Sequence, residues 1–171
     1  MTDLISLIVF ILPSYVANAV PVLLGGGLPL DLGKNFFDGK RLFGDTKTIR
    51  GFIAGVAAGT VVGGIISINM SLQFFASSEV QFIASFMLAL GTMMGDAFGS
   101  FIKRRFSMNS GDPFILDTVL FLVIALMLAY PLTSKEAYQT QNLLYLLILT
   151  LIMHPLTNLI ANRAGLKKVS W

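Results

Sequence analysis

The chain alternates long apolar runs with short polar connections. Five apolar runs cover approximately residues 4–24, 51–70, 82–102, 113–132 and 143–164. A helix needs about 20 apolar residues to cross the roughly 30 Å hydrocarbon core of a bilayer, and each run has about that length. No Lys or Arg precedes the first run, which favours a retained span over a cleaved secretory signal. The pattern predicts an all-α integral membrane protein with about five transmembrane helices.

The composition supports a membrane protein. Hydrophobic residues make up 55% of the 171 residues and the mean hydropathy is +0.78. Charged residues make up 12%, about half of the roughly 25% expected in a soluble domain. These values exclude the ordinary soluble, disordered and fibrous classes, and the lack of cysteine excludes disulfides and thiolate metal sites. The polar connections are too short for a second domain, so residues 1–171 are predicted to form one membrane-embedded domain.

The basic residues are concentrated on one side of the predicted membrane. Eleven of the 12 Lys and Arg residues fall in the connection 25–50, in the connection after the third run, or at and beyond the end of the fifth run. Only Lys135 lies on the other side. By the positive-inside rule the eleven are cytoplasmic, which places the N-terminus outside and the C-terminus inside the cell. The net charge of +3 therefore reflects membrane topology and does not point to a nucleic-acid partner.

Glycines repeat every four residues along the second and third runs. The two stripes are Gly51, Gly55, Gly59 and Gly63, and then Gly91, Gly95 and Gly99. Small residues at this spacing let helix backbones approach closely in a membrane, so we interpret the stripes as packing seams. Gly95 and Gly99 also flank Asp96, where we expect them to leave room for a ligand.

Asp96 and Asp117 are the two acids that fall in or near the predicted spans. Ionisable groups are costly inside a bilayer, so each acid is a functional candidate. Asp96 precedes Lys103 by seven residues, and Asp117 follows the start of the fourth run by four. At 1.5 Å rise per residue both lie about 6 to 10 Å below the cytoplasmic surface. Two carboxylates at similar depth predict a site for a hard cation such as Mg²⁺, completed by water and phosphate oxygens.

Polar residues near these acids extend the candidate site. Ser100, Lys103 and Arg104 share one helix face with Asp96 because they follow it by four, seven and eight residues. Asp112 precedes Pro113, where an acid caps a helix or contributes a ligand. His154 is interpreted as a packing residue and stays outside the catalytic set.

The connection 25–50 combines Gly, Lys, Arg and Thr at close spacing. Glycine backbone N–H groups and basic side chains together bind phosphate, although the Walker A spacing is missing. The alternative is that the basic residues set the topology or contact anionic lipid.

Three segments of the chain are similar to one known family. They read GKRLFGDTKTIRG (39–51), GDAFGSFIKRR (95–105) and HPLTNLIANRAGLKKVSW (154–171). With them, nearly the whole chain resembles the archaeal CDP-archaeol synthases, which are relatives of CDP-diacylglycerol synthase. The wider family has Ser-x-x-Lys-Arg followed by an Asp near the start of the next helix, which here are Ser100, Lys103, Arg104 and Asp117.

The resemblance implies a reaction in which CTP and an unsaturated archaetidic acid, an isoprenoid diether glycerol phosphate, give CDP-archaeol and pyrophosphate with Mg²⁺. The chain would then be one cytidylyltransferase domain in the cell membrane, with its active site facing the cytoplasm and its oligomeric state left open. Asp96 and Asp117 are assigned to the metal, and Lys103 is assigned to catalysis with them. The residues assigned to substrate binding are Asn18, Lys40, Arg41, Asp45, Lys47, Thr48, Arg50, Ser100 and Arg104.

One position departs from the family pattern. Relatives carry a second acid three residues after the first, where this chain has Leu120. A single Mg²⁺ held by Asp96 and Asp117 is therefore expected, in place of a two-metal site.

Three other functions stay open at this stage. A CDP-diacylglycerol synthase would use an ester-linked lipid, and a CTP-dependent polyprenol kinase would phosphorylate a lipid alcohol and release CDP. A small ion-coupled transporter would need acids and openings at both membrane faces, and the outer halves of the predicted spans lack a polar cluster.

Overall fold

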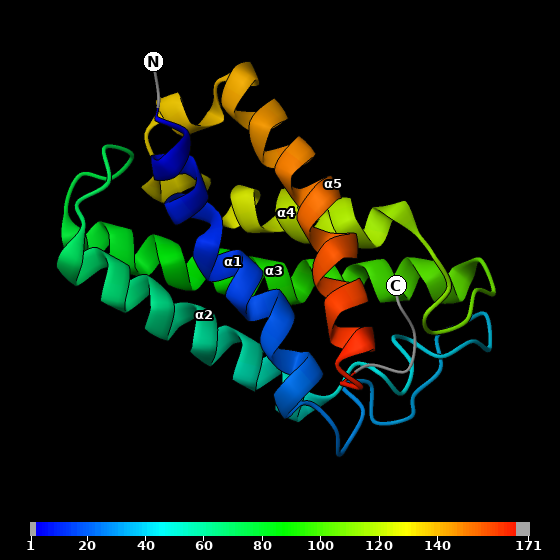
Figure 1. The fold of residues 1–171 in the computed structure, drawn as a ribbon. Helices are drawn as coiled ribbons and strands as arrows, with labels where there is room; N and C mark the ends of the chain where they lie inside the picture. The colour runs from blue at the N-terminus through cyan, green and yellow to red at the C-terminus, as the bar shows by residue number, and fades with distance from the viewer. Residues whose placement is uncertain (1–2, 167–171) are drawn as a thin grey trace.

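The computed structural model describes residues 3–166 and contains five long α-helices, as the hydrophobic pattern predicts (Figure 1). They are α1 (Leu4–Leu24), α2 (Ile49–Asn69), α3 (Ser78–Arg105), α4 (Ile115–Ala129) and α5 (Thr140–Arg163). Two 3₁₀ turns, η1 (Tyr130–Leu132) and η2 (Lys135–Tyr138), connect α4 to α5. All five helices, with α4 counted together with η1, are long and apolar enough to cross a membrane. The basic residues Lys167 and Lys168 lie outside the described residues.

Local sequence explains where two of the helices begin. The Thr48 hydroxyl caps α2 by accepting a 3.1 Å hydrogen bond from the Gly51 N–H. The Ser77 hydroxyl caps α3 by accepting from the Val80 N–H at 3.3 Å, so α3 begins four residues before the predicted start. Three basic residues in the last turn of α3 suit the negative end of its dipole and accompany its extension to Arg105.

The interpretation of Asp112 as a helix cap is wrong. α4 begins at Ile115, two residues after Pro113, and its N-cap residue Phe114 makes no side-chain capping bond. The Asp112 carboxylate instead accepts a 2.6 Å hydrogen bond from the Asn109 N–H. Asp112 therefore closes the short turn between α3 and α4.

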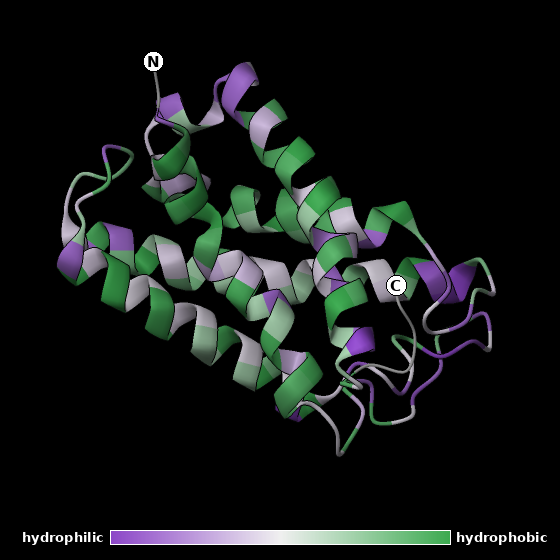
Figure 2. Cartoon of the chain, viewed as in Figure 1, coloured by the Kyte–Doolittle hydropathy of each residue, from purple (hydrophilic) through white to green (hydrophobic). Residues whose placement is uncertain are grey.

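Helix α3 is central, because it packs against α1, α2 and α4. Helix α5 runs obliquely across the others in Figure 1 and contacts α4 and α1. Figure 2 shows mostly apolar residues along the helices and many hydrophilic residues in the loops near the end of α3. The bundle is therefore apolar along its length and polar at the end that holds the long connection.

The glycine stripes are packing seams, as expected. A Cβ on Gly59 would lie 2.6 Å from the Pro13 carbonyl oxygen of α1 and 2.7 Å from Ala89 Cβ of α3. A Cβ on Gly95 would lie 2.5 Å from Phe121 Cα of α4. Gly99 leaves room for the Asp117 carboxylate, whose Oδ1 would lie 3.0 Å from an added Cβ. The two glycines that flank Asp96 thus make room for α4, and the expectation that they make room for a ligand is wrong.

Replacing Gly91 with Ala is expected to destabilise the bundle by about 1–3 kcal/mol, the usual cost of overpacking. The added Cβ would lie 2.6 Å from Ala125 Cα, and a backbone atom cannot rotate away. Thermal unfolding in mild detergent measures the effect. Gly64→Ala is the matched control, because its Cβ would meet only the Phe82 ring at 3.3 Å. Equal melting temperatures for the two variants would contradict the packing role of Gly91.

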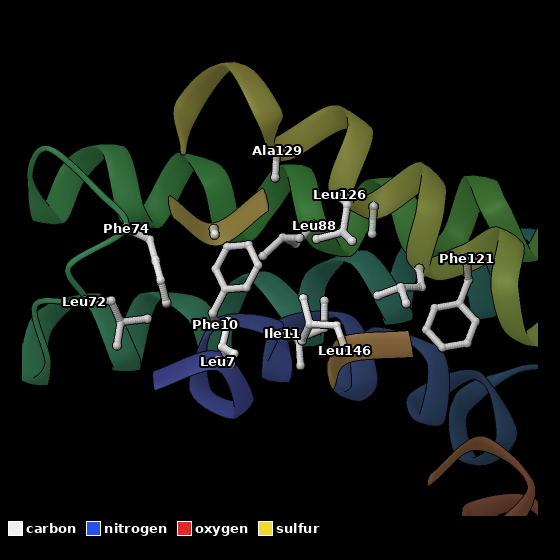
Figure 3. Packing of buried hydrophobic residues seen from close by; sticks show 13 residues of the cluster. Leu7, Phe10, Ile11, Leu72, Phe74, Leu88, Phe121, Leu126, Ala129 and Leu146 are labelled. Atoms are coloured by element: carbon white, nitrogen blue, oxygen red, sulfur yellow. The ribbon is translucent and has the colours of Figure 1, made fainter. Parts of the chain in front are cut away.

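The main apolar core lies at the end of the bundle away from the long connection. It joins the first half of α1, the α2–α3 connection and η2 to Leu88 of α3, to α4 from Phe121 to Ala129 and to Leu146 of α5 (Figure 3). Phe10 and Phe74 meet there edge to face, with ring centroids 5.4 Å apart. Apolar packing thus stabilises one end of the bundle and leaves the other end for polar side chains.

Candidate functional site

A cavity of about 530 Å³ lies at the polar end of the bundle. The end of α1, the second half of α3, the start of α4 and the second half of α5 surround it with two connections. The polar residues that line it are Asn18, Thr46, Lys47, Asp96, Ser100, Lys103, Arg104, Ser110, Asp117, His154 and Asn158. Asp96 and Asp117 therefore face one space, as their similar depth predicts.

Asp96 pairs with a lysine from the long connection. The Lys47 Nζ donates to both Asp96 carboxylate oxygens at 2.6 Å. The Lys47 and Asp96 side chains are 25% and 20% exposed, so both still reach the cavity. The pair joins the connection before α2 to the middle of α3.

Asp117 pairs with a second lysine, which lies two turns beyond Asp96 on α3. The Lys103 Nζ donates to Asp117 Oδ2 at 2.9 Å and to the Asp112 carbonyl oxygen at 2.8 Å. The Lys103 side chain is 6% exposed, so this ion pair is nearly buried. A buried ammonium needs such partners because desolvation is costly.

Two polar atoms of residues that line the cavity lack partners among the described residues. Asp117 Oδ1 and Arg104 Nε are both buried without a hydrogen bond. A native protein rarely leaves buried polar groups unsatisfied, so these two atoms suit a ligand that carries both a cation and anionic oxygens. Residues 3–166 contain no group of three or more His, Cys, Asp or Glu side chains that could hold a metal ion. A cation bound here would therefore be coordinated by oxygens of water and substrate in addition to the two carboxylates. Mg²⁺ is commonly bound in proteins in this way.

Several residues predicted to bind substrate lie elsewhere. Lys40 donates to the Arg105 carbonyl oxygen at 2.9 Å and to Ser107 Oγ at 2.8 Å. Arg41 pairs with Asp31 and with the exposed Asp45. Arg50 is exposed in the first turn of α2, whereas Thr48 lines a smaller cavity of about 70 Å³ that shares Lys47 and Asp96 with the larger one. Of the loop residues assigned to substrate binding, Lys47 is the one that lines the large cavity.

His154 lines the cavity from α5. Its Nδ1 lies 2.8 Å from Thr118 Oγ1, and its ring lies 5.7 Å from the Phe121 ring. These contacts agree with a packing role. They also place a polar ring in the wall of the cavity that the two carboxylates line.

Sequence reasoning missed Thr46, Ser110 and the buried Asp31. Thr46 and Ser110 come from different connections and approach each other at 3.4 Å between hydroxyl oxygens. Neither residue lies in a helix, so no periodicity indicated where its side chain would lie. Asp31 had one signal, an acid followed by Gly33 in an otherwise basic connection, but such a pattern is also typical of an exposed turn.

The fold and the cavity define a multi-span membrane protein with a cavity lined by acidic and basic side chains at one end of its helix bundle. The family model described as CarS-like, CDP-archaeol synthase, matches residues 1–171. The chain therefore belongs to this family.

Individual relatives agree with the family match. A CDP-archaeol synthase of Pyrococcus horikoshii is 42% identical over 172 residues, covering 100% of this chain and 99% of the relative. One from Archaeoglobus fulgidus is 42% identical over 180 residues and covers 100% of both chains. A solved structure of an intramembrane enzyme for archaeal membrane lipids biosynthesis is 33% identical, with a TM-score of 0.78. That match covers 91% of this chain and 94% of the other.

Proposed function

We propose that this protein transfers the cytidylyl group of CTP to the phosphate of an unsaturated archaetidic acid, giving CDP-archaeol and pyrophosphate. The observation that carries the proposal is the cavity in which two lysine–aspartate pairs, Ser100 and Arg104 face one space. Family membership supports the same activity, since the relatives are CDP-archaeol synthases.

The orientation of the chain belongs to this proposal. The eleven clustered Lys and Arg residues would be cytoplasmic, with the N-terminus outside and the C-terminus inside. The cavity then opens near the inner leaflet of the cell membrane. The lipid phosphate would arrive from the bilayer and CTP from the cytoplasm, so the two anions meet at the depth of the carboxylates.

The reaction depends on neutralising the negative charges of the two phosphates more than on a strong base. An oxygen of the lipid phosphate attacks the α-phosphorus of CTP, and the new P–O bond forms as the bond between the α-phosphorus and the bridging oxygen breaks. The bond electrons leave with pyrophosphate. A phosphate monoester is already anionic near neutral pH, so the main barrier is repulsion between two anions. Lys47, Lys103 and Arg104 offset this repulsion and stabilise charge on the leaving group.

Asp96 and Asp117 would hold one Mg²⁺ through their carboxylates. When bound, the ion supplies Lewis-acid polarisation of phosphate oxygens. Lys47 and Lys103, which pair with these two carboxylates, would bind the phosphates of the substrates. The Leu120 backbone packs against α3, where its carbonyl oxygen would lie 2.6 Å from a Cβ on Gly95. Leu120 offers no carboxylate, which is why we propose one ion.

Labelled CTP distinguishes the candidate reactions. Purified protein in vesicles is incubated with Mg²⁺ and CTP carrying label at either the α- or the γ-phosphate. The acceptors are archaetidic acid with geranylgeranyl chains, phosphatidic acid and a polyprenol. We expect α-label in the lipid product and γ-label in pyrophosphate, with archaetidic acid as the best acceptor. Asp96→Asn protein serves as the background control.

Three outcomes would overturn the proposal. Transfer of γ-label to the polyprenol with release of CDP would identify a kinase. Preference for phosphatidic acid would identify a CDP-diacylglycerol synthase. No transfer to any acceptor, together with cation flux across the vesicle membrane, would identify a transporter.

A further inference from the structure

Asp31 is a buried carboxylate at the centre of the long connection. Its side chain is 0% exposed and accepts five hydrogen bonds within that connection. Arg41 donates two of them, from Nη2 at 2.6 Å and from Nε at 3.2 Å. The other three come from the backbone N–H groups of Gly33, Phe43 and Gly44, at 2.9–3.0 Å.

The five bonds keep Asp31 charged. Burial by itself raises the pKa of this carboxyl, but the Arg41 guanidinium and the three backbone N–H groups outweigh it and hold the pKa well below its usual range. Asp31 lines neither the large nor the small cavity. Any effect of Asp31 on catalysis must therefore act through the residues that it holds.

Asp31 fixes the turn that carries Lys47. The carboxylate binds the Gly44 N–H at 2.9 Å, at the start of the turn. The neighbouring Leu30 N–H donates to the Lys47 carbonyl oxygen at 2.6 Å, at its end. Within the turn, the Lys47 N–H donates to the Gly44 carbonyl oxygen at 3.4 Å. Both ends of the turn are thus tied to two consecutive residues, Leu30 and Asp31.

This turn meets the site at two places. The Lys47 Nζ reaches the Asp96 carboxylate at 2.6 Å. The Gly44 backbone lies against the Arg104 side chain, since a Cβ on Gly44 would lie 3.8 Å from three Arg104 side-chain atoms. A shift of the turn would move Lys47 from Asp96 and remove the backbone against which Arg104 rests.

We infer that Asp31 is a positioning residue for nucleotidyl transfer, which holds the Gly44–Lys47 turn so that Lys47 meets Asp96 and the substrate phosphates. This inference rests on the proposed function. It adds a residue that touches no substrate and acts through a lysine 16 positions away in the chain.

The first experiment compares Asp31→Asn with Asp38→Asn. Asn at position 31 keeps the shape of the side chain but loses its negative charge. Its NH₂ group would also face Arg41 and the backbone N–H groups, which are themselves donors. A misplacement of about 1 Å at a reacting group costs up to about a hundredfold in rate, so we expect kcat of Asp31→Asn to fall roughly tenfold or more. The KM for the lipid phosphate should change little. Asp38 lies in the same connection and pairs with Arg105 at 2.9 Å, away from the turn, so Asp38→Asn should keep kcat within about threefold.

A double-mutant cycle separates positioning from general structural support. Residues that act through one another have non-additive effects. In a Lys47→Met background, Asp31→Asn should lower the remaining kcat less than about threefold, because the lysine that Asp31 positions is already gone. A full tenfold loss in both backgrounds would show that Asp31 acts independently of Lys47 and would overturn the inference.

A second variant keeps the test decisive if Asp31→Asn does not fold, which circular dichroism and thermal unfolding will show. Gly44 has φ +88°, a left-handed conformation in which Ala is strained, yet an added Cβ meets only ordinary contacts. Gly44→Ala should show the same loss of kcat and the same non-additivity with Lys47→Met. Wild-type transfer of α-label is measured in each series. Its absence would refute the proposed function, whereas wild-type activity with unaffected Asp31→Asn and Gly44→Ala proteins would refute only this inference.

Discussion

Replacing Asp96 with Asn is expected to lower turnover at least about a hundredfold, the usual scale for loss of a preorganised electrostatic group. The Asp96 carboxylate binds Lys47 through both oxygens and is assigned to Mg²⁺. An amide has the same shape but no charge to hold either cation. The change lies at the wall of the cavity and outside the apolar core, so the helices should remain folded.

The release of labelled pyrophosphate at saturating Mg²⁺ measures the loss of turnover in Asp96→Asn protein. Circular dichroism and thermal unfolding check the fold. Asp38→Asn is the matched control, because it also removes one charge from an ion pair at the same end of the molecule. Near-normal nucleotidyl transfer by Asp96→Asn protein would refute the assignment of Asp96.

Replacing Lys103 with Met is expected to lower both stability and turnover. Lys103 is 5% exposed and binds the Asp117 carboxylate and the Asp112 carbonyl oxygen. Met has a similar length but leaves the Asp117 charge buried without its partner. Breaking a buried ion pair from one side costs about 3–5 kcal/mol, so a large fall in the melting temperature is expected.

A paired variant shows whether the unpartnered charge is the cause. Lys103→Met combined with Asp117→Asn removes both charges, so its stability should return toward that of the wild type while turnover stays lost. Thermal unfolding in mild detergent and pyrophosphate release measure the two effects. If the melting temperature of the Lys103→Met variant equals that of the wild type, the Lys103–Asp117 pair does not stabilise this end of the bundle. If the double variant is less stable than the single one, the unpartnered charge is not the cause of the loss.

The proposed mechanism, in which two lysines neutralise the substrate phosphates, agrees with both predictions. Each aspartate assigned to Mg²⁺ has its own lysine, and the two lysines come from different elements. A site built in this way keeps its charges balanced by protein groups and places two cations at the proposed phosphate site. The same arrangement explains why Asp96 and Lys103 are expected to affect turnover, although one sits at the wall of the cavity and the other is almost buried.

The helices and part of the site could be predicted from the sequence. The apolar runs gave five spans, with ends that differ from the observed helices by a few residues. The periodicity of α3 placed Ser100, Lys103 and Arg104 on the face of Asp96, and all four line the cavity. These predictions succeed because membrane-spanning length and helical periodicity are local properties of the chain.

The partners of the charged residues could not be predicted in the same way. Lys40, Arg41 and Lys47 occur in one basic stretch with nothing in their spacing to separate them. In the structure Arg41 binds Asp31, whereas Lys47 reaches Asp96 on α3. The assignment of Gly95 and Gly99 to ligand space was wrong for a related reason, because the neighbour that fills the space belongs to α4.

The sequence by itself determined the class of protein, the five apolar helices and the two acids that share one end of the bundle, because a bilayer imposes a fixed length and penalises buried charge. Only the tertiary structure decided which lysine meets which aspartate and that Asp31 organises the long connection. The physical reason is that this connection has no periodic structure. Its conformation follows from hydrogen bonds centred on Asp31 within the connection, and from contacts of Lys40 and Lys47 with α3 that form only once the chain has folded.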